Sequence, residues 1–142
     1  RMEQHDNLIK AILALGATLL HFLFGGWTLP LQILAAFVVL DYICGFWAAF
    51  TRKELDSSIG AKGIAKKVGF FVLVAIAHLL DQMAGMGAPV LKTTVIWFLA
   101  ANEALSITEN LGEIGVPIPK ALLDTLKRIK DSPDRTGGIW RD

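Results

Sequence analysis

Cysteine is almost missing from this sequence: Cys44 is the only one among 142 residues. No intrachain disulfide can therefore form, and one thiol inside an apolar run does not indicate a redox compartment. Charge is also scarce, since Asp, Glu, Lys and Arg make up 19% of the chain whereas hydrophobic residues make up 54%. A soluble domain of this length carries more charge and less apolar surface. The composition therefore indicates a membrane protein.

Motifs that carry catalytic chemistry are absent as well. The chain has no His-Glu-x-x-His, no Gly-x-Ser-x-Gly and no Walker loop, and the run from Gly60 to Gly63 lacks the spacing and hydroxyl needed for phosphate. Basic residues cluster between apolar runs rather than along an aromatic-studded polar surface, which argues against nucleic-acid binding. We therefore expect no enzyme, no cofactor and no nucleic-acid partner.

What the chain does have is four long apolar stretches, at residues 8–24, 29–50, 64–83 and 90–111. Each is near the roughly 20 residues that a helix needs to span about 30 Å of hydrocarbon. The fold class predicted is all-α, with four transmembrane helices. The two short gaps contain residues that end and start helices in tight hairpins. These are Gly25, Gly26, Thr28 and Pro30 in the first gap, and Gly85, Gly87 and Pro89 in the second.

The distribution of basic residues predicts the orientation. If the first stretch starts in the cytoplasm, only Lys92 of the 14 basic residues lies on the outer side. The other 13 are inside, which fits the positive-inside rule with both termini cytoplasmic (N-in/C-in). The gap at residues 51–67 is long, polar and basic. We expect it to be a cytoplasmic loop that includes Lys62, Lys66 and Lys67.

A short amphipathic helix is predicted after Pro117 and Pro119, over residues 120–130. Leu122, Leu126 and Ile129 share one face of it. This face could lie on the anionic inner leaflet or pack on the same protein, and the sequence leaves both alternatives open. The polar, turn-rich end of the chain is expected to be disordered. We therefore divide the chain into a membrane domain at 1–112 and a cytoplasmic helix and tail at 113–142.

Acidic residues occur inside two of the apolar stretches. Asp41 costs about 3 kcal/mol near mid-membrane, but eleven apolar neighbours at about 0.5 kcal/mol each offset it. In the fourth stretch, about eight apolar residues contribute roughly 4 kcal/mol, whereas Glu103 and Glu109 oppose insertion by up to about 6 kcal/mol. The fourth helix is therefore marginal, and its polar side must face other helices or water.

That polar side is one stripe, because its members recur at spacings of three and four. They are Asn102, Glu103, Ser106, Glu109 and Asn110. In one interpretation, Glu109 forms a salt bridge with Lys66 or Lys67, since charges inside a membrane usually pair. In the other, Asp41, Asn102 and Glu103 meet in the bundle interior or line a water-filled path. The two interpretations are compatible.

Two further patterns lie within the predicted helices. His78 and Asp81 share one face near the outer end of the third helix. Two ligands without a third do not make a metal site, so a hydrogen-bonded pair is the favoured interpretation. Small residues recur at a spacing of four, which permits close helix contact or self-association. These are Gly45 with Ala49 and Ala100 with Ala104.

Three longer runs carry a family resemblance. They are LDYICGFWAAFTRKELDSSIGAKGIAKK, VAIAHLLDQMAG and NEALSITENLGEIGVPIPKALLDTLKRIK. In this order and register they resemble the toxin-secretion and phage-lysis holins, often called bacteriophage holin family 4. The matching segments cover about residues 40 to 130 and leave out the first apolar stretch and the tail. The matching positions include the acidic and amide residues already described.

The resemblance implies a function. Such holins are small phage proteins that accumulate in the bacterial cytoplasmic membrane and oligomerise into lesions at a set time. The lesions let an endolysin reach the peptidoglycan, and no direct binding between holin and endolysin is implied. Relatives serve in toxin release. Membrane lipid, further copies of the chain and an antiholin are the implied partners. An antiholin itself, a plain anchor or a small four-helix transporter with a membrane glutamate would carry similar helices.

Overall fold

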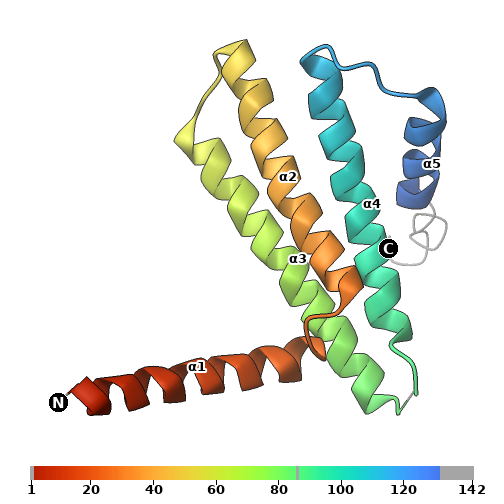
Figure 1. Ribbon diagram of the computed structural model, residues 1–142. Helices are drawn as coiled ribbons and strands as arrows, with labels where there is room; N and C mark the ends of the chain where they lie inside the picture. Colours follow the sequence, from red (N-terminus) through yellow and green to blue (C-terminus); the bar gives the residue numbers. More distant parts are fainter. Residues whose placement is uncertain (1, 86, 132–142) are drawn as a thin grey trace, which may run out of the picture.

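The computed structural model describes residues 2–85 and 87–131. They form α1 (Met2–Phe24), α2 (Leu29–Arg52), α3 (Ser57–Met83), α4 (Val90–Glu113) and α5 (Lys120–Asp131), with no strand among these described residues (Figure 1). The first four helices are long and apolar enough to cross a membrane. The predictions of an all-α fold and four span-length helices are therefore confirmed.

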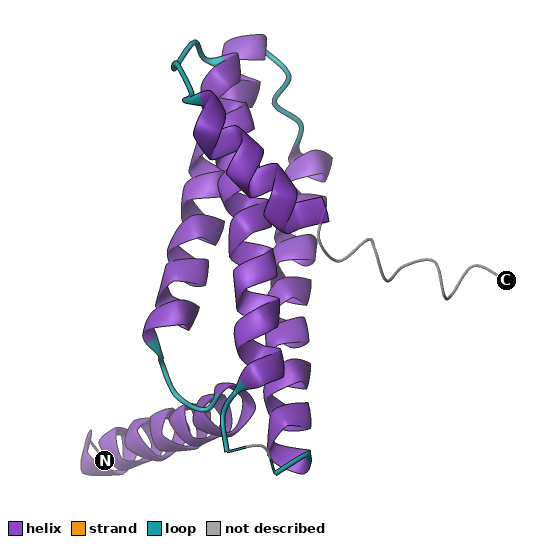
Figure 2. Cartoon of the chain, turned by 90° about the vertical axis from the view of Figure 1, so that its right-hand side faces the viewer, coloured by secondary structure: helices purple, strands orange, loops and turns teal. Residues whose placement is uncertain are grey.

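Helix α4 is the centre of the bundle, because it packs against α2, α3 and α5 (Figures 1 and 2). It is the least apolar of the four span-length helices and the most buried. Other helices thus cover much of α4, as its polar sequence requires. The main apolar core is built from α2, α3 and α4. Its buried members are Leu31, Leu34, Val74, Ile96, Leu99 and Ala100.

The bundle has two ends, which we name by the helix attached to each. The α1 end holds the turns that join α1 to α2 and α3 to α4. The α5 end holds residues 53–56, which join α2 to α3, and the segment leading to α5 (Figure 1).

The predicted hairpin of the first two helices is wrong. Gly25 and Gly26 do adopt the left-handed conformation, with φ of 68° and 101°, and Pro30 lies in the first turn of α2. Thr28 occupies the N-cap position, but its side chain makes no capping hydrogen bond. Instead of folding back along α2, α1 runs across the direction of the other long helices (Figures 1 and 2).

Contacts with α3 and α4 hold the C-terminal end of α1 in place. The ammonium of Lys92 donates a hydrogen bond to the carbonyl oxygen of Phe24. The Phe24 ring meets the edge of the Phe71 ring, with 6.4 Å between ring centroids. These contacts hold the last turn of α1, whereas its preceding apolar side chains, such as Leu13 and Leu19, stay exposed.

The long loop predicted at residues 51–67 is also wrong, because only residues 53–56 connect α2 to α3. Lys53 ends α2 in the left-handed conformation, with φ of 58°. The next helix starts at once, since the backbone N–H of Gly60 donates to the carbonyl of Asp56. Alanine and lysine are good helix formers, which favours extending α3 in this direction. Lys62, Lys66 and Lys67 therefore lie on a helix and not in a loop.

Helix α5 exists as predicted and packs on the same chain, which was one of its two alternatives. Leu126 is buried against Ala101 and Leu105 of α4, with Leu123 and Ile129 partly buried beside it. The tail predicted to be disordered, residues 132–142, lies outside the described residues. The domain boundary at residue 112 stays a prediction.

Candidate functional site

An ionic cluster lies inside the bundle where α2, α3 and α4 meet. The ammonium Nζ of Lys67 is 2.6 Å from Oδ2 of Asp41 and 2.5 Å from Oε2 of Glu103. These side chains are 14%, 12% and 3% exposed, respectively. One lysine thus bridges two carboxylates from two different helices.

The neighbouring residues allow this approach. Asn110 of α4 donates a hydrogen bond to Oδ1 of Asp41, at 3.4 Å. Gly45 lies one turn from Asp41 on α2, and a Cβ atom added to it would sit 3.5 Å from Nδ2 of Asn110. This distance is an ordinary van der Waals contact, so Gly45 lies directly beside the amide that contacts the cluster.

The cluster carries one more negative charge than positive charge when all three groups are ionised. Charges at this depth in a membrane are costly unless they pair or meet water. The pairing with Lys67 satisfies one oxygen of each carboxylate, and cavities lie on both sides of the cluster. This arrangement gives the bundle a polar centre with nearby space for water.

The first cavity, of about 310 Å³, opens between α3, α4 and α5. Its lining includes most of the predicted polar stripe together with three lysines. The lining polar residues are Asp41, Lys66, Lys67, Asn102, Glu103, Ser106, Glu109 and Lys130. The second cavity, of about 660 Å³, opens on the α2 and α3 side and includes Asp41, Gly45, Lys67 and Asn110 in its lining.

Most of the polar stripe predicted on α4 therefore lines one cavity, but the salt bridge predicted for Glu109 is not the one formed. Lys67 contacts Asp41 and Glu103 rather than Glu109. Glu109 is exposed at the cavity mouth, further along α4 than Glu103. Lys66 also lines the first cavity, but its Nζ lies 5.7 Å from the centroid of the Phe70 ring. The rotation between two consecutive residues of α3 thus separates the lysine that binds both carboxylates from its exposed neighbour.

At the α1 end, the predicted hydrogen-bonded pair of His78 and Asp81 is not formed. The Asp81 carboxylate accepts hydrogen bonds from the backbone N–H groups of Leu91 and Lys92, at 2.9 and 2.8 Å. It thereby satisfies two free donors of the first turn of α4. Nδ1 of His78 is buried without a hydrogen-bond partner. No group of three potential metal ligands occurs in the part of the chain that the structure describes.

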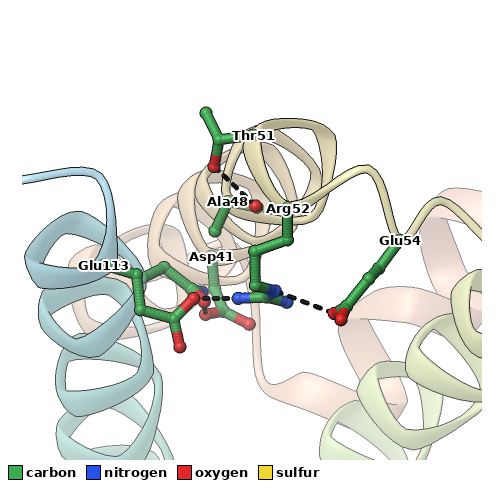
Figure 3. A network of polar contacts seen from close by, with 7 residues as sticks. Asp41, Ala48, Thr51, Arg52, Glu54 and Glu113 are labelled. Atoms are coloured by element: carbon green, nitrogen blue, oxygen red, sulfur yellow. Dashed lines mark hydrogen bonds and ion pairs between the residues drawn. The ribbon is translucent and has the colours of Figure 1, made fainter.

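A second ion pair closes the α5 end. Arg52, in the last turn of α2, contacts Glu113 at the end of α4 and Glu54 in the following loop (Figure 3). The three side chains are 45% to 67% exposed, so we expect these two ion pairs to add little stability. The pair of Arg52 with Glu113 links α2 to α4 at the rim of the second cavity, which Arg52 and Glu54 line.

The small residues singled out in the sequence lie mainly at contacts within the chain. Gly45 faces Asn110, and Ala49 lines the same cavity. Ala100 belongs to the main apolar core, and Ala104 packs in the cluster formed by α4 and α5. These positions allow helices of one chain to approach closely, and self-association through them stays a prediction.

Sequence reasoning missed the part played by Lys130 and Lys92. Lys130 lies at the end of α5 and lines the first cavity, because α5 folds back along α4. Lys92 is 5% exposed and holds the end of α1. Both contacts join residues distant in sequence, so no local spacing could have revealed them. The apolar face of α5 was the only signal that it packs on another element.

Known sequences similar to this chain include uncharacterised proteins and a probable phage holin. An uncharacterised 14.9 kDa protein of Clostridium perfringens is 40% identical over 131 residues, which is 92% of this chain and 98% of the relative. An uncharacterised Listeria monocytogenes protein is 42% identical over 111 residues, 78% of each chain. A probable holin of Bacillus phage phi105 is 34% identical over 105 residues, 74% of this chain and 77% of the relative. No solved structure matches.

The profile of the bacteriophage holin family matches residues 18–131. The match is wider than the resemblance recognised in the sequence, since it takes in the end of α1 and all of α2. It also includes the ionic cluster and α5. With most of its length matched in this way, the chain belongs to the bacteriophage holin family.

Proposed function

We propose that this chain is a holin of the bacterial cytoplasmic membrane, where copies of it assemble into lesions at a set time. The proposal includes cytoplasmic placement of both termini, with α5 entering its contact on α4 from the cytoplasmic side. Family membership supports the role. The orientation is supported by the basic residues, because all but Lys92 of the 14 would lie on the cytoplasmic side.

The observation that carries the mechanism is the cluster of Lys67 with Asp41 and Glu103. In a single bundle the lysine satisfies both carboxylates. When copies assemble, a small movement of α4 would turn the cluster toward water shared between them. Because α4 is the least apolar of the candidate spans, its displacement from lipid contact costs little.

The rest of the polar stripe would line the same path. Asn102, Ser106 and Asn110 are half-buried and Glu109 is exposed, so each is near water or polar groups already. Lesions lined in this way would let an endolysin pass to the cell wall without a binding site for it. The partners in this proposal are lipid and further copies of the chain.

Expression of the full chain in a bacterial host tests the function. Membrane potential and the release of a large cytoplasmic enzyme are followed after induction, with and without a co-expressed endolysin that lacks an export signal. We expect a sudden loss of potential at a reproducible time and release of the cytoplasmic enzyme only when the endolysin is present. Steady growth with an intact potential would contradict the proposal.

The same measurement separates two other candidates. An antiholin expressed alone would leave the membrane potential intact. Expressed with a lytic relative, it would delay the loss of potential that the relative causes. A small transporter would give gradual, saturable cation flux without killing the cell, and would bind its cation stoichiometrically. Glu103 is compatible with the transporter, but its engagement by Lys67 favours a structural role in this arrangement.

A further inference from the structure

Helix α5 has two unlike faces. Its apolar face packs on α4 through Leu126, with Leu123 and Ile129 beside it. Charged residues occupy the remaining surface, and all of them are exposed. They are Lys120, Asp124, Lys127, Arg128, Lys130 and Asp131, four basic and two acidic residues.

The place where α5 packs is deep along α4. Its partners Ala101 and Leu105 lie 12 and 8 residues before the last residue of α4, Glu113. At 1.5 Å per residue these positions are about 18 and 12 Å from that end. Figure 1 shows α5 folded back beside α4 and not extending beyond it. If α4 spans about 30 Å of hydrocarbon, α5 lies at the depth of lipid tails.

Lipid tails cannot surround the charged face of α5, because lysine and arginine are strongly disfavoured at this depth. Other exposed positions in the bundle differ: Val39, Val72 and Ile76 are apolar and suit lipid contact. The side of α4 that carries α5 therefore needs water or polar protein, whereas these positions on α2 and α3 can face lipid.

The contact also forms part of the site. Lys130 lines the 310 Å³ cavity together with Lys67, Glu103 and Glu109, so the end of α5 forms one wall of it. The connection to α4 is not helical, since Gly115 has φ of 90° and Pro117 and Pro119 follow. Helix α5 can thus leave α4 without unwinding it.

We propose that α5 is a detachable strap, which covers one side of the polar cavity while seated on α4 and must leave before the chain opens an aqueous path. This proposal rests on the proposed function. In the seated state the charged face of α5 occupies the water side of α4, where a path would form. Release of α5 would expose the cavity, with Glu103 and Lys67 at its base, to that water.

A reversible cross-link tests the strap. In a chain with Cys44→Ala, Ala101→Cys and Leu126→Cys place two thiols in the buried contact of α4 with α5. The matched control pairs Ala101→Cys with Thr125→Cys, because Thr125 is exposed and is turned about 100° around α5 from Leu126. Cells that express each variant with the endolysin are treated with a mild oxidant, and loss of free thiols is followed by a maleimide gel shift.

We expect the oxidised Ala101 and Leu126 pair to delay release of a cytoplasmic enzyme at least tenfold, and a reductant to restore it within minutes. Release on the control schedule from fully cross-linked protein would overturn the strap while leaving the proposed function intact. Failure of the wild-type chain to release enzyme under any condition would instead contradict the proposed function.

A second variant needs no cross-link. Leu126→Asp should unseat α5 and advance the onset of release, whereas Thr125→Asp changes an exposed side chain outside the apolar face and should leave the onset unchanged. An unchanged or later onset for Leu126→Asp, at equal protein in the membrane, would overturn the strap.

Discussion

At the scale of single residues, Lys67 satisfies two acidic groups that the membrane would otherwise reject. Its ammonium is within hydrogen-bond distance of both Asp41 and Glu103, and all three side chains are largely buried. The sequence predicted that the acidic residues need polar partners, because their insertion cost is large. It could not predict which lysine serves, since that depends on how α3 is rotated about its axis.

We predict that Lys67→Leu destabilises the bundle by about 3 to 5 kcal/mol, because it leaves two buried carboxylates without their cation. The matched control is Lys66→Leu, one residue away on an exposed position, which should change stability by less than about 1 kcal/mol. Unfolding in detergent micelles, followed by circular dichroism, measures both.

A second comparison identifies the cause of that loss. Adding Asp41→Asn and Glu103→Gln to Lys67→Leu should recover much of the lost stability, because the neutral amides no longer require a cation. Equal stability of the Lys67→Leu and Lys66→Leu proteins would mean that the cluster does not stabilise the fold.

At the scale of helices, the junction of α1 with α2 is tightly specified. Gly25 has φ of 68°, and a Cβ atom there would lie 2.5 Å from Cε1 of His78. Both the backbone conformation and the neighbouring ring therefore require glycine. The sequence predicted that α1 ends at Gly25 and Gly26, but the direction of α1 depends on contacts of Phe24 with Phe71 and Lys92, which are distant in sequence.

We predict that Gly25→Ala lowers the free energy of unfolding by more than the roughly 1 to 2 kcal/mol expected from the left-handed backbone alone. Gly85→Ala measures that backbone part, because Gly85 has φ of 61° and no atom near its absent Cβ. Gly16→Ala, in the open middle of α1, should be neutral or slightly stabilising. Thermal unfolding of each variant measures these changes in stability. A smaller loss of stability for Gly25→Ala than for Gly85→Ala would show that His78 moves aside easily.

Some helix boundaries follow from the local sequence, whereas other features of the helices depend on contacts distant in sequence. The bounds of α2 and α4 agree closely with their apolar stretches, because hydropathy decides where such helices lie. Helix α3 starts at Ser57 instead of the predicted Ile64, since residues 57–63 are polar and resemble a loop by hydropathy alone. The packing of α5 on Ala101 and Leu105 could not be predicted, because it depends on the three-dimensional path of residues 114–119.

At the scale of the whole molecule, the arrangement of α1 bears on membrane topology. A helix that runs across the others cannot span the bilayer at the same time as they do, although it is long and apolar enough to span. The basic residues favour a cytoplasmic N-terminus. We therefore expect α1 to give up the contacts of Phe24 with Phe71 and Lys92 and to turn at Gly25 and Gly26 when it enters the membrane.

Single cysteines in a Cys44→Ala chain test this topology. With a membrane-impermeant maleimide added to intact spheroplasts, we expect labelling of Thr28→Cys, in the turn between α1 and α2. Gln4→Cys and Asp124→Cys should react only after permeabilisation. Labelling of Gln4→Cys in intact spheroplasts would place α1 on the outer surface and contradict the predicted orientation.

The central position of α4 also has a consequence for how the protein is made. Ribosomes deliver α4 after α1, α2 and α3, so α2 meets its main packing partner late in synthesis. Until then, Asp41 and Lys67 enter the membrane without Glu103. A chain interrupted before residue 90 would therefore leave inserted helices that cannot complete the bundle, and cellular quality control would be expected to degrade them.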